Sequence, residues 1–240
     1  MVPVLCITTT NRVDLFAKMV DSIDYPIRRV SVLVNNYSID YLLEIRNLCK
    51  SDFVQEFMVS HCPYNMGYST STNYHIKMNC DSYYWLVSSD DVIFAAGDLE
   101  TVNGAMSKFD LAGPGHQQSG PLLHMGILFG LTRRCIDIAG FLDENIHPVN
   151  FEDNEWLDRV KNANVNYTIL DLKSQNWGGG TFAGYEEDVK NFVRWDKDCP
   201  YELNRLYYED KILTRRDFTE AKFNFEERSK KLTLIDSWIS

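Results

Sequence analysis

Long apolar runs, closely spaced cysteine pairs and an excess of positive charge are all missing from this 240-residue sequence. No stretch approaches the roughly 20 apolar residues that a helix needs to cross a bilayer, and the chain opens on strand-like sequence without a signal-peptide pattern. The six cysteines are scattered, with no C-x-x-C pair and no metal-ligand spacing, which favours free thiols in a reducing compartment. We therefore expect a cytoplasmic protein without a membrane span.

Positive charge is scarce because 24 lysines and arginines stand against 34 acidic residues, which leaves a formal net charge of −10. Nucleic acids and anionic membrane surfaces are bound through basic patches, so the balance argues against both as the main partner. An anionic ligand would have to be held locally, by a metal ion, a helix N-terminus or a few cations. The apolar content of 45% is that of an ordinary globular protein, and the length suits one large α/β domain or two small ones.

Apolar runs alternate with helical patterns in the first part of the chain. Val2 to Ile7 and Val30 to Val34 are typical of strands, and each is followed by a polar loop and a helical pattern. Two such strand–loop–helix units indicate a parallel sheet with right-handed crossovers. Neither loop contains a G-x-G-x-x-G fingerprint, which argues against a dinucleotide-binding Rossmann enzyme.

The rest of the chain continues this pattern and then changes character. Further strands are predicted over Val54 to Ser60, Tyr83 to Val87, His124 to Leu131 and Val165 to Leu170. The stretch from Gly113 to Pro121 is the most loop-like, which is typical of a lid and equally of a disordered connector. Beyond Tyr185 the sequence becomes helical and strongly charged. We predict an α/β sheet domain over residues 1–184 and a helical extension over residues 185–240 that packs on it.

The stretch from Trp85 to Ile93 (WLVSSDDVI) ends an apolar run in two adjacent carboxylates, Asp90 and Asp91. In open α/β sheets, ligands bind beyond the carboxyl ends of the strands. Adjacent carboxylates raise each other's pKa unless a cation compensates them, so the pair suits Mg²⁺ or Mn²⁺. A strand followed by an Asp-rich turn explains the same pattern, since Asp is favoured in turns.

A second acidic pair, Glu152 and Asp153, comes just before a helical pattern marked by Trp156, Leu157 and Val160. The spacing places both carboxylates in or before the first turn of that helix. Carboxylates there are stabilised by the helix dipole, so simple N-terminal capping also explains them.

Five short motifs follow one another along the chain: ITTTNR, NNYSID, NMG with Asn73 further on, SSDDV, and GFLDENIHPVNFEDNEWLDR. Each motif is weak alone, but in this order they resemble the inverting GT-A glycosyltransferases of family 2 over roughly Val2 to Thr181. The resemblance implies a Rossmann-like, mostly parallel central sheet flanked by helices, with a helical C-terminal tail. Residues 1–184 would form the nucleotide-sugar-binding catalytic domain.

The resemblance also implies roles for individual residues. The residues expected in the nucleotide-sugar pocket are Thr8, Thr10, Arg12, Asn35, Asn65, Gly67, Asn73 and Asp90. Among these, Asn35 would read the base. Asp91 takes the place of the metal-binding carboxylate of the family's D-x-D motif, and Asp153 takes the place of the general base.

Three positions depart from the family pattern. Ser89 stands where the first acid of D-x-D usually lies, so a metal ion would take most of its ligands from diphosphate and water. Asn35 replaces an Asp, and its amide can donate as well as accept, which loosens the base preference. Gln175 and Asn176 stand near the position where many relatives carry a metal-binding His.

The implied reaction is hexosyl transfer from a nucleotide sugar, with a UDP-sugar expected, to a hydroxyl of a glycan or glycoconjugate acceptor. Mn²⁺ or Mg²⁺ would neutralise the leaving diphosphate, and a carboxylate would accept the proton of the acceptor in a single displacement with inversion. An alternative is a GT-A scaffold that binds a sugar nucleotide or a partner without turnover. A third possibility, phosphoryl or nucleotidyl transfer, predicts a Gly-rich loop with a Lys, and residues 8–14 contain neither.

Overall fold

The structure is a computed structural model of the chain. Some residues for which the sequence predicts a role lie outside the residues that the structure describes. Asn65, the tip of the predicted loop after Gly115, the three glycines 178–180 and most of residues 185–240 lie outside the described residues. The described residues are 1–36, 38–63, 66–115, 123, 125–146, 150–176 and 200–214.

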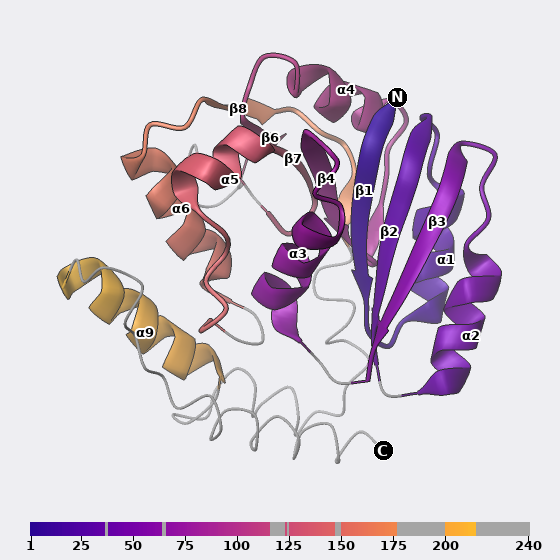
Figure 1. Ribbon diagram of the computed structural model, residues 1–240, viewed down its shortest axis with the longest axis horizontal. Helices are drawn as coiled ribbons and strands as arrows, with labels where there is room; N and C mark the ends of the chain where they lie inside the picture. Colours follow the sequence, from indigo (N-terminus) through magenta and orange to yellow (C-terminus); the bar gives the residue numbers. More distant parts are fainter. Residues whose placement is uncertain are drawn as a thin grey trace.

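A seven-stranded sheet forms the centre of the protein (Figure 1), in the order β3-β2-β1-β4-β7-β6-β8. Its strands are β1 (Val2–Thr9), β2 (Ile27–Asn35), β3 (Val54–Cys62), β4 (Tyr84–Ser89), β6 (Leu111–Pro114), β7 (Leu128–Thr132) and β8 (Tyr167–Leu170). Only β7 runs antiparallel to its neighbours, so the predicted mostly parallel α/β sheet is confirmed. A small antiparallel sheet joins β5 (Val92–Ile93) to β9 (Gln175–Asn176).

Helices cover both faces of the sheet because its strands carry apolar side chains on both faces. The helices are α1 (Val13–Asp21), α2 (Ile39–Leu48), α3 (Gly67–Met78), α4 (Asp98–Ala105), α5 (Arg133–Ala139), α6 (Glu152–Asn162) and α9 (Pro200–Thr214). Leu5 and Ile7 of β1 share one core cluster with α1, α2 and α4. Val4 and Cys6 share the other with α3, α5 and α6. The two cores fix β1 and β4 at the middle of the molecule.

Strand β6 was not predicted from the sequence, because Gly113 and Pro114 are the first residues of the stretch that we predicted to be a loop. The structure places both residues in β6, paired with β8, so the loop prediction is wrong for them. Gly113 is required there because a Cβ atom would lie 2.5 Å from Leu123 Cδ2 and 2.8 Å from Phe129 Cβ. The glycine therefore marks close packing rather than a turn.

Two further expectations concern the whole chain. The described cysteines, which are Cys6, Cys49, Cys62, Cys80 and Cys135, are all free thiols, as expected; Cys199 lies outside the described residues. Among the helices of the described residues, none combines the length and the apolar character needed to span a membrane.

Candidate functional site

The ends of three neighbouring strands meet at one edge of the sheet. Thr8 of β1 pairs with Ser89 of β4, and Thr9 pairs with Val34 of β2. The polar loops that follow β1, β2 and β4 therefore leave the sheet at the same edge, which is where open α/β sheets bind ligands.

The adjacent carboxylates lie in a tight turn between β4 and β5, where Asp90 is 3% and Asp91 5% exposed. Asp90 accepts hydrogen bonds from the Thr9 hydroxyl and from the Thr10 N–H. Burial raises the pKa of Asp90 to about 7, with a smaller contribution from the charge of Asp91. The Asp90 Oδ2 atom has no hydrogen-bond partner among the described residues. The turn therefore presents a buried acid oxygen that a cation could satisfy.

A second layer of hydroxyl groups supports Asp90. The Thr9 hydroxyl is hydrogen-bonded to the hydroxyl of Tyr41, which lies in the first turn of α2. Burial, and next to it the negative charge of Asp90, raises the pKa of Tyr41. Neither Thr9 nor Tyr41 was predicted to belong to the site. The only sequence signal for a role of Tyr41 is general: a buried tyrosine needs a hydrogen-bond partner for its hydroxyl.

Arg12 supplies positive charge next to the acid pair. Its guanidinium holds the Asp14 carboxylate with two hydrogen bonds, of 2.8 and 2.7 Å. The hydrogen bond to Asp14 raises the pKa of Arg12 most, and the charges of Asp90 and Asp91 add to the effect. Arg12, predicted to face the nucleotide, thus lies within electrostatic reach of the predicted metal residues.

Two asparagines at the end of β2 connect the neighbouring loops. Asn35, expected to read the base, accepts a 2.9 Å hydrogen bond from the Met66 N–H through its amide oxygen. Asn36 donates from its amide to the Thr10 carbonyl and accepts from the Ser38 N–H at 2.7 Å. Asn36 was not singled out in the sequence, yet it joins the loops after β1 and β2.

Thr8 faces away from Thr9, as alternation along a strand requires. Its hydroxyl lies 3.2 Å from His75 Nε2 in α3, and Ser31 lies 3.0 Å from the other ring nitrogen. Burial lowers the pKa of His75 to about 4, so the ring is neutral at pH 7. The structure therefore brings Thr8 together with α3 rather than with the acid pair.

Gly67 and Asn73 of α3 have structural roles. Gly67 has φ +74, a left-handed conformation that glycine adopts without a steric cost, and it begins α3. Asn73 is 1% exposed, so this helical asparagine is buried rather than solvated. Its amide exchanges hydrogen bonds of 2.9 and 3.0 Å with the Leu142 backbone and donates to Glu144 at 2.9 Å. Asn73 thereby fixes the loop that leads towards α6.

The second acidic pair starts α6, as predicted. Glu152 is 6% exposed, and its Oε2 atom has no hydrogen-bond partner among the described residues. Burial, followed by the charge of Asp153, raises the pKa of Glu152 to about 8. Asp153 is partly exposed, and its Oδ1 atom accepts from the Asn154 N–H at 2.8 Å. Asp153 is thus the accessible acid of the pair.

Tyr68 of α3 is influenced electrostatically by the second acidic pair. Burial raises the pKa of the Tyr68 hydroxyl, and the charges of Glu152 and Asp153 raise it further. The same hydroxyl donates to the Met125 carbonyl at 2.9 Å. The next carbonyl, that of Gly126, accepts from Ser89 at 3.2 Å and from the Asn176 amide at 2.5 Å. The Met125–Gly126 segment therefore links Tyr68 of α3 to Ser89 at the end of β4.

The acid pair at the end of β4 fits part of a divalent metal site. Carboxylate oxygens are the ligands that Mg²⁺ and Mn²⁺ prefer, and the buried Oδ2 of Asp90 is available to a cation. Within the described ranges, His, Cys, Asp and Glu side chains form no group of three that could hold a metal alone. A cation here would need further ligands from a phosphate or water.

The fold is similar to that of solved nucleotide-bound structures. The mannosyltransferase PcManGT from Pyrobaculum calidifontis, in complex with GDP-Man and Mn²⁺, matches 87% of this chain over 69% of its own, with a TM-score of 0.58 and 12% identity. S. aureus TarS 1–349 in complex with UDP matches 71% of this chain over 58% of its own, with a TM-score of 0.51 and 14% identity. TarS 1–349 in a second structure matches 95% over 77%, with a TM-score of 0.54 and 12% identity.

At the level of sequence, no protein-family model and no curated protein matches this chain. The structural likeness therefore concerns the fold, a mostly parallel α/β sheet flanked by helices.

Proposed function

We propose that this protein is an inverting glycosyltransferase that moves a hexosyl group from a nucleotide sugar to a hydroxyl of a glycan or glycoconjugate. The observation that carries the proposal is the buried acid pair Asp90–Asp91 at the end of β4, with an Asp90 oxygen that no described residue satisfies, together with the accessible carboxylate of Asp153 at the start of α6. The fold likeness to structures that hold GDP-Man with Mn²⁺ and UDP supports a nucleotide-sugar donor. The motif order supports family 2 and a UDP-sugar.

In this mechanism the loops after β1, β2 and β4 hold the donor. Asp91, with Asp90 beside it, would bind Mn²⁺ or Mg²⁺, which supplies neutralisation of the charge that develops on the diphosphate. Arg12 adds positive charge at the same place, as its interaction with both aspartates indicates. Asn35 is proposed to stand next to the base.

The start of α6 is proposed to act on the acceptor. Asp153 is the exposed member of its pair and would accept the proton of the acceptor hydroxyl as that oxygen attacks the anomeric carbon. The bond to the diphosphate breaks as the new glycosidic bond forms, so one displacement inverts the anomeric centre. No enzyme nucleophile is required. We assign this chemistry to residues 1–184 and a packing role to residues 185–240.

A second candidate function is a scaffold that binds a sugar nucleotide or a partner without turnover. Ser89 favours it, because this serine stands in place of an acid and donates to the Gly126 carbonyl at 3.2 Å. The described residues also contain no group of three metal-ligating side chains. The scaffold predicts nucleotide binding without transfer.

The first test measures the thermal midpoint with UDP, GDP, dTDP and CDP, each with Mn²⁺ and again with a chelator. A ligand that binds only the folded state stabilises it by about 2.7 kcal/mol at a hundredfold excess over its dissociation constant. A shift with one nucleotide that disappears with the chelator supports a metal-bridged site and identifies the base. A chain that none of the four stabilises would contradict the glycosyltransferase and the nucleotide-binding form of the scaffold.

The second test replaces Asp153 by Asn and follows transfer to a panel of glycoside acceptors. Loss of a general base should lower transfer by at least about 10²-fold while the nucleotide-induced midpoint shift survives. The matched control is Asp137→Asn, the same change at an exposed position on α5, which should retain wild-type transfer. Unchanged transfer in Asp153→Asn would remove that residue from the mechanism, and no transfer by the wild type would favour the scaffold.

A further inference from the structure

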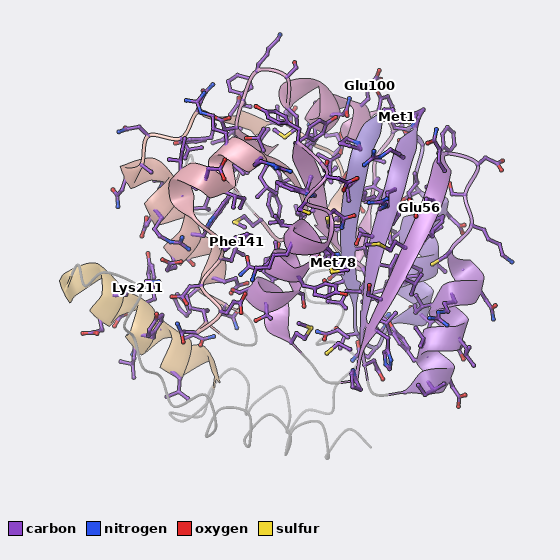
Figure 2. The ribbon with its side chains drawn as sticks, viewed as in Figure 1. Met1, Glu56, Met78, Glu100, Phe141 and Lys211 are labelled. Carbon is purple, nitrogen blue, oxygen red and sulfur yellow. The ribbon has the colours of Figure 1, made fainter. Side chains whose placement is uncertain are left out.

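A buried ion cluster fixes α9 against α6. Lys211, labelled on α9 in Figure 2, has its ammonium 2.8 Å from Glu155 Oε1, and this ammonium also contacts the Asp143 carboxylate. The Tyr207 hydroxyl donates to Asp143 Oδ2 at 2.7 Å. Arg159 of α6 holds both oxygens of Glu155 at 2.7 Å. Two acids and two cations thus lock α9 to α6 and to the loop before it.

The backbone immediately before α6 has an unusual conformation. Asn150 has φ +79 and Phe151 has φ +72, so two consecutive residues with side chains are in the left-handed region. This region is disfavoured for residues that carry a Cβ atom, and such residues persist only where neighbouring contacts hold them. The turn leads directly into the helix whose second residue is Asp153.

Both residues of this turn are in contact with α9. The Asn204 amide donates to the Asn150 carbonyl at 3.3 Å. The Phe151 ring stacks on Tyr208, with ring centroids 5.7 Å apart and planes at 29°. The Tyr208 hydroxyl in turn donates to Asp158 Oδ2 at 2.8 Å, which fixes the ring against α6. One helix from a distant part of the sequence therefore holds each left-handed residue.

We propose that α9 is the element that orients the general base: Asn204 and Tyr208 are positioning residues that keep the 150–151 turn left-handed and so hold Asp153 towards the acceptor. This inference rests on the proposed function, because it assumes that Asp153 is the base. It assigns to the C-terminal helix a role in the chemical step, beyond packing on the sheet domain.

The contacts of α9 predict which kinetic constant should change. Asn204, Tyr207, Tyr208 and Lys211 contact α6 and the segment that precedes it, while the donor loops follow β1, β2 and β4. Release of the turn would displace the first turn of α6 and leave those loops in place. A misplaced base slows the chemical step, so kcat should fall while KM for the donor stays unchanged.

The first experiment compares three variants of α9 in the full chain. Tyr208→Ala removes the ring and should lower kcat by about 10-fold or more, with donor KM and the nucleotide-induced midpoint shift unchanged. Tyr208→Phe keeps the stacked ring and should retain most of kcat. Arg205→Ala is the matched control, since Arg205 pairs with Glu209 along the same helix, and it should retain wild-type kcat.

The second experiment tests the backbone conformation itself. Asn150→Gly leaves the carbonyl that Asn204 uses and permits a positive φ without a steric cost. Introduced into Asn204→Ala, it should restore kcat at least about threefold, because glycine adopts a positive φ without the steric cost that the Asn204 contact offsets in asparagine. A side chain with a purely structural role would not be rescued at this position. Tyr208→Ala, with and without Phe151→Gly, gives the same comparison if Asn204→Ala does not fold.

The outcomes separate this inference from the proposed function. If the wild type transfers sugar and Asp153→Asn does not, but Tyr208→Ala and Asn204→Ala keep wild-type kcat, the positioning role is refuted and the function stands. A lower kcat that Asn150→Gly fails to restore refutes the role of the turn. Absence of transfer by the wild type overturns both. A fall in kcat that Asn150→Gly reverses, at constant donor KM, supports the proposal.

Discussion

Replacing Glu152 by Gln should change how the stability of the protein depends on pH. The folded-state pKa of Glu152 is about 8, against an ordinary value of 4.5. A raised pKa means that the unfolded state loses its proton first, so stability present below pH 4.5 is lost as the pH rises towards 8. From pH 5 to pH 8, this single group should lower the free energy of unfolding by roughly 3 kcal/mol. Glutamine has the shape of the protonated acid and no charge to lose.

The assay is urea unfolding at pH 5 and pH 8. Glu152→Gln should be close to the wild type at pH 5 and more stable at pH 8, with a gap that widens by roughly 3 kcal/mol. The control is Glu100→Gln, an exposed residue on α4 that is labelled in Figure 2, and it should follow the wild type at both values. Parallel curves for Glu152→Gln and the wild type would show that this carboxyl is not protonated in the folded state, which refutes the reasoning from burial.

Three further predictions concern packing, charge and ligand binding. Gly130→Ala should destabilise by about 1–3 kcal/mol in urea unfolding, because its Cβ would lie 2.5 Å from Met106 Sδ. Lys211→Met should cost about 3–5 kcal/mol in the same assay, because it leaves two buried carboxylates without their shared cation. Asp91→Asn should abolish the Mn²⁺-dependent part of the nucleotide-induced midpoint shift, while Asp137→Asn should keep it. Gly130→Ala at wild-type stability, or an undiminished shift in Asp91→Asn, would contradict these assignments.

The sequence predicted the parts of the fold that follow from continuous apolar runs. The first four strands and the helices after the first two of them were placed correctly, although β2 begins at Ile27 rather than Val30. It failed where a strand is short or contains turn-forming residues. β5 and β9 have two residues each, too few for a periodic pattern, and β6 contains Gly113 and Pro114. The residues of these three strands pair because their partner strands lie beside them in the fold. No local sequence pattern reveals such partners.

The acidic residues of the candidate site could be predicted from the sequence, but the hydrogen bonds of its polar side chains could not. Asp90 and Asp153 could be singled out because each follows or begins a clear element. Asn35 and Asn73 were predicted to lie at the donor, and that role stays a prediction; their amide hydrogen bonds to Met66, 31 residues on, and to Leu142, 69 residues on, were not predicted. An asparagine carries no mark that tells a ligand contact from a backbone contact, because both use the same donors and acceptors. Only the folded chain decides between them.

The two acidic pairs share a feature that their sequences, DD and ED, do not reveal. In each pair the first acid is buried with one oxygen that no described residue satisfies, and burial raises its pKa to about 7 in Asp90 and about 8 in Glu152. Either a proton or a bound cation on the first acid removes the repulsion that two adjacent ionised carboxylates would exert. At the end of β4 the proposed metal ion would take the place of the proton on Asp90. At the start of α6 the buried Glu152 and the accessible Asp153 differ in their surroundings and not in their chemistry, so the fold rather than the sequence distinguishes the two neighbouring carboxylates.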